Sequence, residues 1–453
     1  MAEAIRHDKT TRQLKLLSQA LDSGRLGPVR RLVNTLSPAE IGNLLESLPP
    51  ARRAVVWGLV DAEDDGEVLL HVGEEVRESL LADMDPDEII AAVEDLDIDD
   101  LADLVEDLPD TVIEEVLKSM DRENRERLEQ ALSYPEDTAG RLMNPDVITV
   151  RADVTLDVVL RYLRLRGEMP EHTDHLFVVS RRHQYIGRLA VTALLTHEPT
   201  TPINELIDDE QPAFSAGTSA NEVANQFSDH DWVSAPVVDA NNILLGRITI
   251  DDVVDIIREQ AEHQTLGAAG LDEDEDMFSP VRRAVKRRAL WLGINLITAF
   301  LAAAVIGRFE ATLQQVVALA VLMPIVAGMG GNAGTQVLTL MVRGLALGQI
   351  GSSNLRALLT KELLVALFNG LLWGAVTGIA AAIWFQGIAI GLVIFAALVI
   401  NLVAAAGAGV LVPLTLKRMG IDPALAGTVV LTTVTDVIGF LAFLGLGTLL
   451  LLG

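Results

Sequence analysis

Residues 363–416, LLVALFNGLLWGAVTGIAAAIWFQGIAIGLVIFAALVINLVAAAGAGVLVPLTL, form 54 consecutive positions without a charged side chain. One helix that crosses a bilayer needs about 20 such residues, so this stretch is long enough for two. Phe385-Gln386-Gly387 supplies the turn between them. A buried all-α core of a soluble protein is the alternative interpretation, but so long a run without charge disfavours it.

Apolar stretches on both sides of this run extend the same pattern. Residues 286–453 are therefore predicted to form an all-α transmembrane pore domain. The second span contains Pro324 and a run of glycines, which predict a break in the helix, and the last contains one charge, Asp436. The five predicted helices cover about residues 289–308, 312–343, 361–385, 388–416 and 423–451.

Basic residues orient these helices, because lysine and arginine accumulate in cytoplasmic loops. All of the basic excess falls on one side of the predicted bundle, which places the N-terminus in the cytosol and the C-terminus outside a bacterial-type cytoplasmic (inner) membrane. The basic residues on that side are Arg282, Arg283, Lys286, Arg287, Arg288, Arg343, Arg356, Lys361, Lys417 and Arg418.

Charge divides the chain into two parts. Residues 282–453 hold only 4 of the 63 acidic residues and 11 of the 35 basic ones, a net charge of +7, so the preceding part carries −35 and the whole chain −28. A strongly acidic surface disfavours nucleic acid as a partner and attracts cations. The chain has no cysteine, which excludes disulfides and thiolate metal sites. Its opening residues lack an apolar core, so no cleaved signal peptide is expected.

Residues 1–135 show helical periodicity without a strand pattern and are predicted to form an acidic α-helical solenoid. Ser37 before Pro38, and Asp85 before Pro86, are typical helix N-caps followed by proline at the first helical position. The acidic run over residues 83–110 serves either solubility or cation binding.

A repeated α/β pattern follows. Leu176-Phe-Val-Val179 with Gly187-Arg188 recurs as Ala235-Pro-Val-Val238 with Gly246-Arg247. This repeat resembles a tandem pair of CBS domains, with boundaries at residues 136–200 and 201–262. The resemblance implies nucleotide binding, with ATP as the candidate ligand, on one side only, through Thr249 and Asp252. The first repeat has alanines at the corresponding positions.

Acidic residues then follow one face of a predicted helix: Asp251, Asp255, Glu259 and Glu262. Like charges at this spacing destabilise a helix by a few tenths of a kcal/mol per pair, so a counter-charge is expected. A divalent cation is one candidate. The basic surface of residues 282–288 is the other.

Polar groups inside the predicted spans are the second set of candidates. Asn332 and Thr335 follow the glycine run of the second span. Irregular backbone at membrane depth is tolerated where it lines a wet cavity, although close helix packing through small residues also explains glycines. Asp436 lies in mid-span, where a carboxylate costs roughly 2.5–3.5 kcal/mol and marks a functional site by default. No basic residue lies at that depth. A carboxylate among neutral oxygens, without histidine or thiolate, favours hydrated Mg²⁺.

The whole chain resembles the MgtE family of Mg²⁺ channels. The likeness is carried by the domain order, by Gly330-Gly-Asn332-Ala-Gly334, by Asp422-Pro-Ala-Leu425 and by the 134–143 string YPEDTAGRLM. It implies a homodimer in the lipid membrane in which Asp436 of both protomers, with Asn332 alongside, forms the pore site for Mg²⁺. Thr335, a further candidate ligand of this site, stands where the family commonly has a second asparagine. Asp422 would stand at the cytosolic mouth, residues 263–285 would form a connecting (gating) helix, and regulatory Mg²⁺ would bind Asp251, Glu259, Glu262, Asp255 and Asp95.

The expected function is import of Mg²⁺, closed by cytosolic Mg²⁺ that binds the acidic domains, and thus a role in Mg²⁺ homeostasis rather than enzymatic catalysis. The alternative is a divalent cation transporter coupled to H⁺ or Na⁺, or an exporter. An intramembrane metalloprotease is disfavoured, because that class needs H-E-x-x-H and the chain has only His197-Glu198 followed by proline. His263 departs from the family pattern, which has an acid there.

Overall fold

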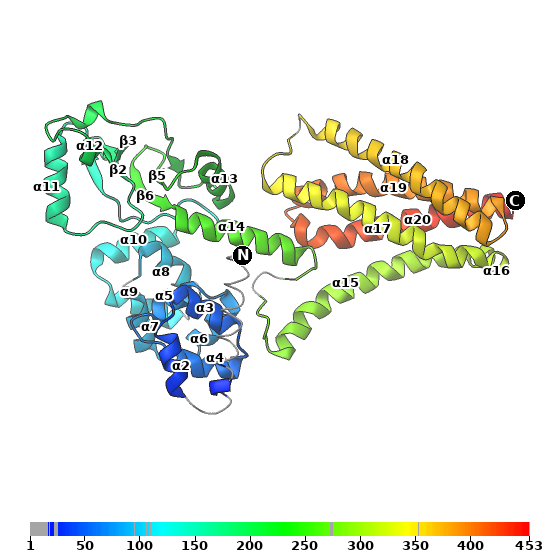
Figure 1. The fold of residues 1–453 in the computed structure, drawn as a ribbon, viewed down its shortest axis with the longest axis horizontal. Coiled ribbons are helices and arrows are strands. Elements are labelled where there is room, and N and C mark those ends of the chain that lie inside the picture. The colour runs from blue at the N-terminus through cyan, green and yellow to red at the C-terminus, as the bar shows by residue number, and fades with distance from the viewer. Residues whose placement is uncertain are drawn as a thin grey trace. The chain divides into compact units, whose positions relative to one another are not determined.

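The computed structural model describes residues 17, 19–21, 26–94, 96–105, 107–108, 110–271, 275–351 and 353–452. The chain divides into two compact units (Figure 1). The first unit is Met1–Glu259 with Asp274–Ser279, and the second is Gln260–Glu273 with Pro280–Gly453.

Short helices fill the first part of the first unit. Serine and aspartate caps start several of them, as predicted: the backbone N–H of Glu40 donates to Ser37 Oγ at 3.3 Å, and that of Asp85 donates to Glu88 Oε2 at 3.0 Å. The helices share one apolar core. They are α2 (Leu26–Val33), α3 (Pro38–Glu46), α4 (Pro50–Trp57), α5 (Asp65–Leu70), α6 (Glu74–Leu81), α7 (Pro86–Val93), α8 (Ile98–Val105), α9 (Asp110–Ser119) and α10 (Arg122–Leu132).

Two α/β repeats complete the first unit, and each has a three-stranded sheet. In both sheets the middle strand pairs in parallel with the first strand and antiparallel with the last. The first contains β1 (Thr149–Arg151), α11 (Leu156–Arg166), β2 (His175–Val179), β3 (Tyr185–Ala190) and α12 (Ala193–Thr196). The second contains η1 (Ile203–Glu205), β4 (Phe214–Ser215), α13 (Ala220–His230), β5 (Ser234–Val238), β6 (Leu244–Thr249) and α14 (Ile250–Gly267).

The repeated glycines have a packing reason. Gly187 pairs with Val178, and Gly246 with Val237, so both occupy the same place in their sheets. A Cβ added at either glycine would lie 2.7 Å from a backbone carbonyl oxygen of a third segment. Glycine is therefore needed because another backbone approaches closely.

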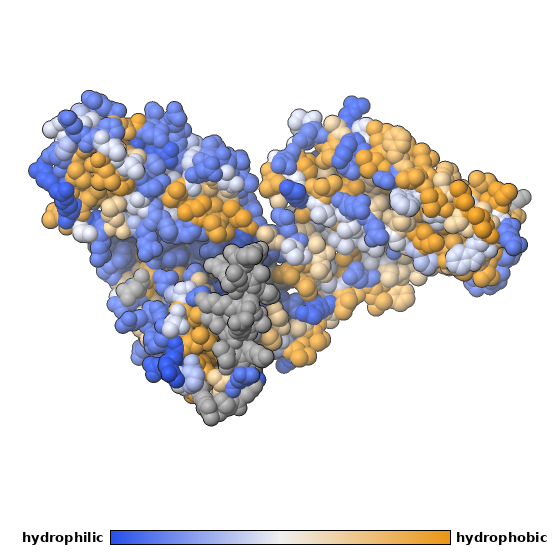
Figure 2. Space-filling model, in the orientation of Figure 1, coloured by the Kyte–Doolittle hydropathy of each residue, from blue (hydrophilic) through white to orange (hydrophobic). Residues whose placement is uncertain are grey.

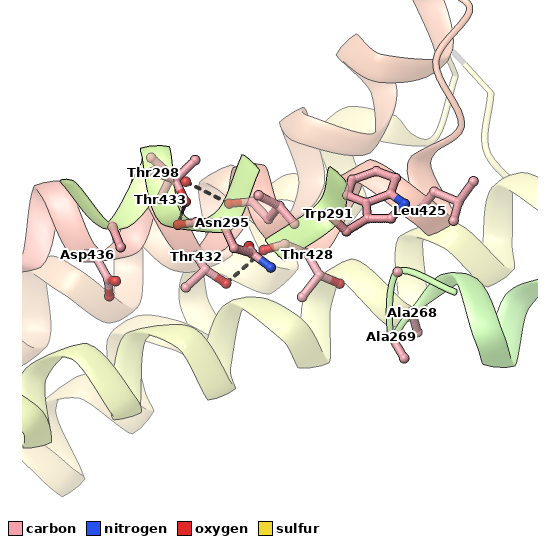
Figure 3. Close-up of a pocket in the computed structure, with 13 residues that line it drawn as sticks. Ala268, Ala269, Trp291, Asn295, Thr298, Leu425, Thr428, Thr432, Thr433 and Asp436 are labelled. Atoms are coloured by element: carbon pink, nitrogen blue, oxygen red, sulfur yellow. Dashed lines mark hydrogen bonds between the residues drawn. The ribbon is translucent and has the colours of Figure 1, made fainter. Parts of the chain in front are cut away.

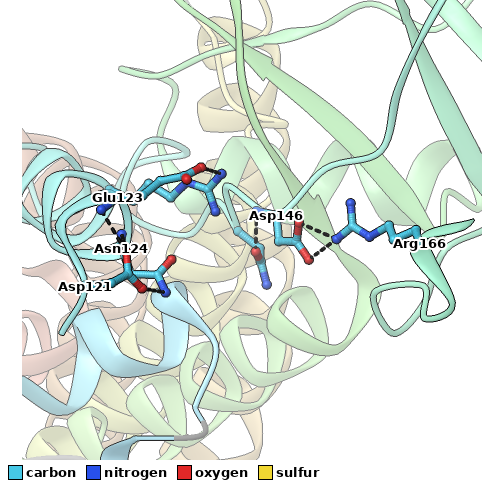
Figure 4. Close-up of polar contacts among 7 residues, drawn as sticks. Asp121, Glu123, Asn124, Asp146 and Arg166 are labelled. Carbon is cyan, nitrogen blue, oxygen red and sulfur yellow. Dashed lines mark hydrogen bonds and ion pairs between the residues drawn. The ribbon is translucent and has the colours of Figure 1, made fainter. Parts of the chain in front are cut away.

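Polar contacts tie segments of this unit together (Figure 4). Asp121 caps α10 by accepting hydrogen bonds from the backbone N–H of Glu123 and Asn124, at 2.8 and 3.0 Å. Arg166, at the end of α11, binds both carboxylate oxygens of Asp146 at 2.8 Å. Such charge-assisted pairs fix geometry more than they add stability where they are exposed.

The second unit consists mainly of five long apolar helices, each long enough to cross a membrane: α15 (Val281–Gly307), α17 (Val317–Ala346), α18 (Leu355–Trp384), α19 (Ile388–Arg418) and α20 (Pro423–Leu451). The short α16 (Glu310–Gln315) lies between the first two. Hydrophobic side chains cover these helices, whereas hydrophilic ones dominate the first unit (Figure 2). Helix α19 packs against α17, α18 and α20 and is the most buried of the five. The predicted fold class is confirmed.

Two sequence predictions about helices are wrong. Helix α17 is continuous through Pro324 and the glycines, so the predicted break is absent. The connecting helix predicted at residues 263–285 does not exist as one helix. Helix α14 ends at Gly267, Gly270 has a positive φ of 73°, and α15 begins at Val281 after Pro280. Glycine and proline end these helices for the reasons that make them helix terminators generally.

The segment before α15 packs on the N-terminal helices. The guanidinium of Arg53 binds Asp276 Oδ2 at 2.8 Å, and the two side chains are only 3 % and 5 % exposed. Arg53 also donates to the carbonyls of Leu45 and Leu48, at 3.0 and 3.1 Å. The backbone N–H of Asp276 donates to Glu75 Oε2 at 3.2 Å. Residues 275–279 are thus held by a buried ion pair.

Candidate functional site

Glycines set the spacing of the helices that carry the candidate pore residues. Leucines of one helix fill the space over glycines of the other: Leu431 lies over Gly334, and Leu338 over Gly427. An added Cβ at these two glycines would come within 2.9 and 3.0 Å of those leucines. Small residues therefore bring α17 and α20 close together, as is typical of membrane helices. Close packing, rather than an irregular backbone, explains Gly334 of the glycine run.

Asp436 lines a cavity of about 210 Å³ in the second unit (Figure 3). The cavity lies between α15 and α20, and the residues after α14, 268–270, also line it. Within the described part of the chain, the carboxylate of Asp436 has no ion pair and no hydrogen bond. Its polar neighbours in the lining are all neutral: Asn295, Thr298, Thr428, Thr432 and Thr433.

The threonines of this lining keep oxygen atoms available. Thr432 Oγ1 donates to the carbonyl of Thr428 at 2.7 Å, and Thr433 Oγ1 donates to that of Val429 at 2.7 Å. Each hydroxyl donates its one hydrogen to a carbonyl of its own helix, so its oxygen can act toward other groups only as an acceptor. Asn295 and Thr298, on α15, were not predicted from the sequence. Their signal in the sequence is that they are polar, although uncharged, residues in an otherwise apolar span.

Asn332 and Thr335 lie elsewhere on the second unit. Both are exposed on α17, and neither belongs to the lining of the Asp436 cavity. Thr339, one turn after Thr335, donates to its carbonyl at 2.9 Å. The chain alone therefore does not bring the predicted pore residues into one site, and it leaves a polar patch on the outside of an apolar helix.

Asp422 is the N-cap of α20. Its Oδ1 accepts from the backbone N–H of Ala424 at 2.9 Å, and its Oδ2 lies 2.7 Å from Nε2 of His263 on α14. Beside this contact, Gly267 at the end of α14 packs on Ala424. The histidine that departs from the family pattern thus binds the carboxylate predicted at the cytosolic mouth.

The predicted regulatory acids have separate surroundings. Asp251 Oδ2 lies 3.3 Å from Nε2 of His172, and Asp255 lies 3.8 Å from Arg258. Glu259 and Glu262 are exposed on α14. Asp95, the remaining predicted residue, lies outside the described residues.

A denser carboxylate cluster, Asp97, Asp99, Asp100, Asp251 and Asp252, lies where the first turns of α8 and α14 meet. Burial, with the negative charges of neighbouring carboxylates, raises the pKa of Asp252 to about 8 and that of Asp100 to about 7. Burial and the charge of Asp252 likewise raise the pKa of Asp99 well above its ordinary range. Asp97, Asp99 and Asp100 are functional candidates that the sequence marked only as an acidic run.

Two features reduce the electrostatic repulsion within this cluster. Acidic residues in the first turn of a helix are stabilised by the positive end of its dipole, and two such ends meet here. The guanidinium of Arg247, 4 % exposed, lies close enough to interact with Asp97, Asp99 and Asp251. Even so, among the described residues no group of three carboxylate or imidazole side chains is already arranged to hold a metal. A cation would have to draw these side chains together.

The candidate nucleotide residues overlap with this cluster. Asp252 Oδ2 accepts from the backbone N–H of Thr249 at 3.4 Å and from Thr249 Oγ1 at 3.2 Å. The same carboxylate interacts with Asp99. Asp252 can therefore take part in nucleotide binding and in the acidic cluster.

Comparisons with known proteins agree with this arrangement along the chain. Residues 323–446 match the family MgtE, described as divalent cation transporter, residues 36–137 match the MgtE intracellular N domain, and residues 139–199 and 203–259 match CBS domains. Among solved structures, the cytosolic domain of the Mg²⁺ channel MgtE in complex with ATP is 30% identical, with a TM-score of 0.48. The match covers 53% of this chain and 98% of that one.

Two relatives match the chain over nearly its whole length. The magnesium transporter MgtE of Bacillus subtilis is 27% identical over 450 residues, which cover 99% of each chain. The magnesium transporter MgtE of Thermus thermophilus is 30% identical over 448 residues, which cover 96% of this chain and 98% of the relative. With an acidic helical part, two CBS repeats and five membrane-length helices in that order, this chain belongs to the MgtE family of magnesium transporters.

Proposed function

We propose that the protein imports Mg²⁺ through a pore in which Asp436 binds the ion. The observation that carries this proposal is a cavity whose lining holds one carboxylate without an ion pair and otherwise only neutral polar and apolar side chains. Mg²⁺ releases its water reluctantly and is typically held by one or two carboxylates with several waters retained. A single aspartate among hydroxyls and an amide suits such a hydrated ion better than Ca²⁺, which needs six to eight oxygen ligands.

The pore belongs to a homodimer in this proposal. Asn332 and Thr335 are polar residues exposed on a membrane-length helix. Polar groups facing lipid are costly, so they face a cavity or another protein surface. A second copy of the chain, related by two-fold symmetry, would cover the Asn332–Thr335 patch of each copy at once and present two Asp436 carboxylates to one ion. Asp422 would lie on the cytosolic side, with the N-terminus inside and the C-terminus outside.

Cytosolic Mg²⁺ closes the pore in this proposal by binding the acidic cluster and the acids of α14. Burial and mutual repulsion raise the pKa values of Asp99, Asp100 and Asp252, so their ionised forms are unfavourable without a counter-ion. Carboxylates are the ligands that Mg²⁺ prefers. A divalent ion between α8 and α14 would relieve the repulsion. The regulatory set then comprises Asp251, Asp255, Glu259, Glu262 and Asp95 from the sequence, with the newly found cluster residues.

Nucleotide binding is a separate part of this proposal. Thr249 and Asp252 form the hydrogen-bonded pair that would face the ribose of ATP in the second CBS repeat. Because Asp252 also belongs to the acidic cluster, ATP and cytosolic Mg²⁺ would act on the same carboxylate. Isothermal titration of the purified protein with ATP, for wild type and Thr249→Ala, tests this, and equal heats for both proteins would refute the assigned site.

The decisive experiment measures Mg²⁺ uptake in a strain that lacks its own Mg²⁺ importers. Asp436→Asn and Asp436→Ala are expected to abolish uptake while the protein still reaches the membrane. Glu310→Gln is the matched control, because Glu310 is the exposed acid of α16 and lies outside the cavity. Uptake by Asp436→Asn at the wild-type rate would refute the proposal.

A coupled transporter, linked to H⁺ or Na⁺, or an exporter remains the alternative, because a lone carboxylate can also carry a proton. Flux in liposomes separates the two. A passive pore gives currents that follow the Mg²⁺ gradient and the voltage, whereas a coupled carrier also responds to an imposed pH or Na⁺ gradient.

A further inference from the structure

Asn401 is a buried amide at the junction of three membrane-length helices. It belongs to α19, and its side chain is 0% exposed. Its Nδ2 donates to the carbonyl oxygen of Val326 on α17 at 2.9 Å. Within the described chain, its Oδ1 is buried without a hydrogen-bond partner. Neither the family resemblance nor the comparisons assign this residue a role.

Two glycines leave the space that this amide fills. A Cβ at Gly330 of α17 would lie 2.2 Å from Nδ2 of Asn401, and one at Gly439 of α20 would lie 2.7 Å from the same atom. Real Cβ atoms do not approach so closely, so neither glycine can be replaced while Asn401 keeps its place. Asn401 therefore contacts both helices that carry the candidate pore residues.

The two glycines that contact Asn401 lie close in sequence to the candidate pore residues. Gly330 precedes Asn332 by two residues, and Gly439 follows Asp436 by three, which is about one helical turn. The other close approaches between α17 and α20 are filled by apolar side chains, such as Leu431 over Gly334. Asn401 thus fills the space over its glycines with a polar side chain, whereas the other such spaces hold apolar side chains. It lies at the same position along the helices as the predicted ion ligands.

Packing alone does not explain an amide here. A buried polar atom without a partner costs about 1–3 kcal/mol, whereas an apolar group of suitable shape avoids that cost. The compensating feature is the directional hydrogen bond to Val326, which an apolar filler cannot make. Such a bond fixes the rotation of α17 about its axis as well as its distance from α19.

We propose that Asn401 is a positioning residue for ion transport: its hydrogen bond holds α17 in the rotation that presents Asn332 to the ion, and its contact with Gly439 holds α20, which carries Asp436, beside it. The proposal rests on the proposed transport function and adds to it a residue that touches neither ion nor water in the pore. Removing the amide lets α17 rotate without unfolding the bundle.

A cycle of two substitutions separates packing from positioning. Gly330→Ala places a methyl group against the amide and is expected to lower both Tm and Mg²⁺ flux. Asn401→Ala removes the amide and is expected to lower flux about tenfold, which corresponds to about 1.4 kcal/mol. Little change in Tm is expected, because the lost hydrogen bond is offset by removal of the buried Oδ1 that has no partner. The double variant is expected to recover Tm but not flux. Recovery of flux with Tm, or normal flux in Asn401→Ala, would overturn the proposal.

A thiol probe reads the rotation of α17 without any need for transport. The chain contains no native cysteine, so Asn332→Cys introduces a single one. Its rate of reaction with a charged methanethiosulfonate is expected to change at least about fivefold when Asn401→Ala is added, because rotation moves position 332 relative to water. An unchanged rate would contradict the proposal. Leu338→Met, a volume-conserving change in an apolar filler, is the matched control and is expected to keep Tm, flux and labelling rate.

The same experiments separate failure of this proposal from failure of the proposed function. If the wild-type protein carries no Mg²⁺, the transport proposal fails, while the labelling rates still show whether Asn401 sets the rotation of α17. If wild type transports Mg²⁺ and Asp436→Asn does not, but the Asn401 variants behave as wild type, only the positioning role is refuted.

Discussion

The two units of the molecule treat carboxylates in opposite ways. In the first unit, Asp99, Asp100 and Asp252 lie among other charges, at the meeting point of two helix N-termini, and their pKa values are raised by burial and by one another. In the second unit, Asp436 lines a cavity in which every other lining side chain is neutral, and no described side chain forms an ion pair with it. A crowded cluster can respond to a cation by changing shape, whereas a lone carboxylate in a fixed lining can only bind one and release it.

This difference accords with a division between regulation and permeation. The crowded cluster has no group of three ligands already arranged for a metal among the described residues, so the proposed cation binding there would require these side chains to move. The Asp436 cavity lies within one packed helical bundle, where the ligands are held by the helices themselves. The following predictions test the contrast, beginning with the largest expected effect.

Loss of the lone carboxylate should have the largest effect. Asp436→Asn keeps the shape but removes the charge, and Mg²⁺ flux is expected to fall at least about 100-fold, equivalent to about 2.8 kcal/mol. Flux into liposomes, followed with a Mg²⁺-sensitive dye, measures this. By contrast, Asp99→Asn in the crowded cluster should preserve the maximal flux. If both variants lost flux equally, the division between permeation and regulation would be wrong.

Breaking the buried ion pair between Arg53 and Asp276 should strongly destabilise the first unit. Arg53→Met leaves Asp276 buried without its cation and is expected to lower the free energy of unfolding of that unit by about 3–5 kcal/mol. The double variant Arg53→Met/Asp276→Leu should recover most of this loss. Hydrogen–deuterium exchange of α4 in the full-length protein provides the measurement.

An exposed pair supplies the control for this test. Arg30 lies 3.5 Å from Asp61, with side chains 64 % and 47 % exposed. Arg30→Met is expected to change the stability by less than about 1 kcal/mol. An equal effect of Arg30→Met and Arg53→Met would show that residues 275–279 are not held by a buried pair in solution.

Relief of repulsion in the acidic cluster should stabilise the protein modestly. Asp99→Asn removes one of several close negative charges and is expected to raise the Tm in EDTA by a few degrees, while the stabilisation by added Mg²⁺ shrinks. Glu114→Gln removes an equal charge from an exposed ion pair with Lys118 and should leave both values unchanged. A Mg²⁺-induced Tm shift in Asp99→Asn as large as in wild type would argue against the cluster as a cation site.

The pH dependence of stability provides the smallest and most specific test. The pKa values of Asp100 and Asp252 are raised from 3.8 to about 7 and about 8 in the folded protein. The folded state therefore binds more protons than the unfolded state between these limits, and the free energy of unfolding falls as pH rises from about 4 to about 8. In EDTA, the Tm of wild type should decline over this interval more than that of Asp100→Asn/Asp252→Asn. Saturating Mg²⁺ should flatten the wild-type curve, and identical curves for both proteins would refute the assignment.

Several features of the fold could be predicted from local sequence because their physical causes are local. Ser37 and Asp85 before prolines predict helix starts, and charge-free runs of membrane length predict spanning helices. The recurrence of Gly187-Arg188 as Gly246-Arg247 predicts two equivalent sheets. The predicted break at Pro324 is absent, because neighbouring helices can satisfy the backbone groups that proline frees in a membrane helix. The connecting helix predicted at residues 263–285 is divided between two helices, because α14 ends at Gly267 and Pro280 starts α15.

Residue types along the chain are enough to predict the membrane character of residues 286–453, the order of the domains and the one carboxylate in mid-span, because hydropathy, repetition and charge depend only on residue type. Which side chains surround that carboxylate was decided by tertiary structure alone. Asn295 and Thr298 reach the cavity only because α15 packs beside α20. Likewise, Asp99 meets Asp252 only because α8 and α14 begin at the same place, across more than 150 residues of intervening chain. Contacts between distant segments depend on how the helices pack, so local sequence patterns do not predict them.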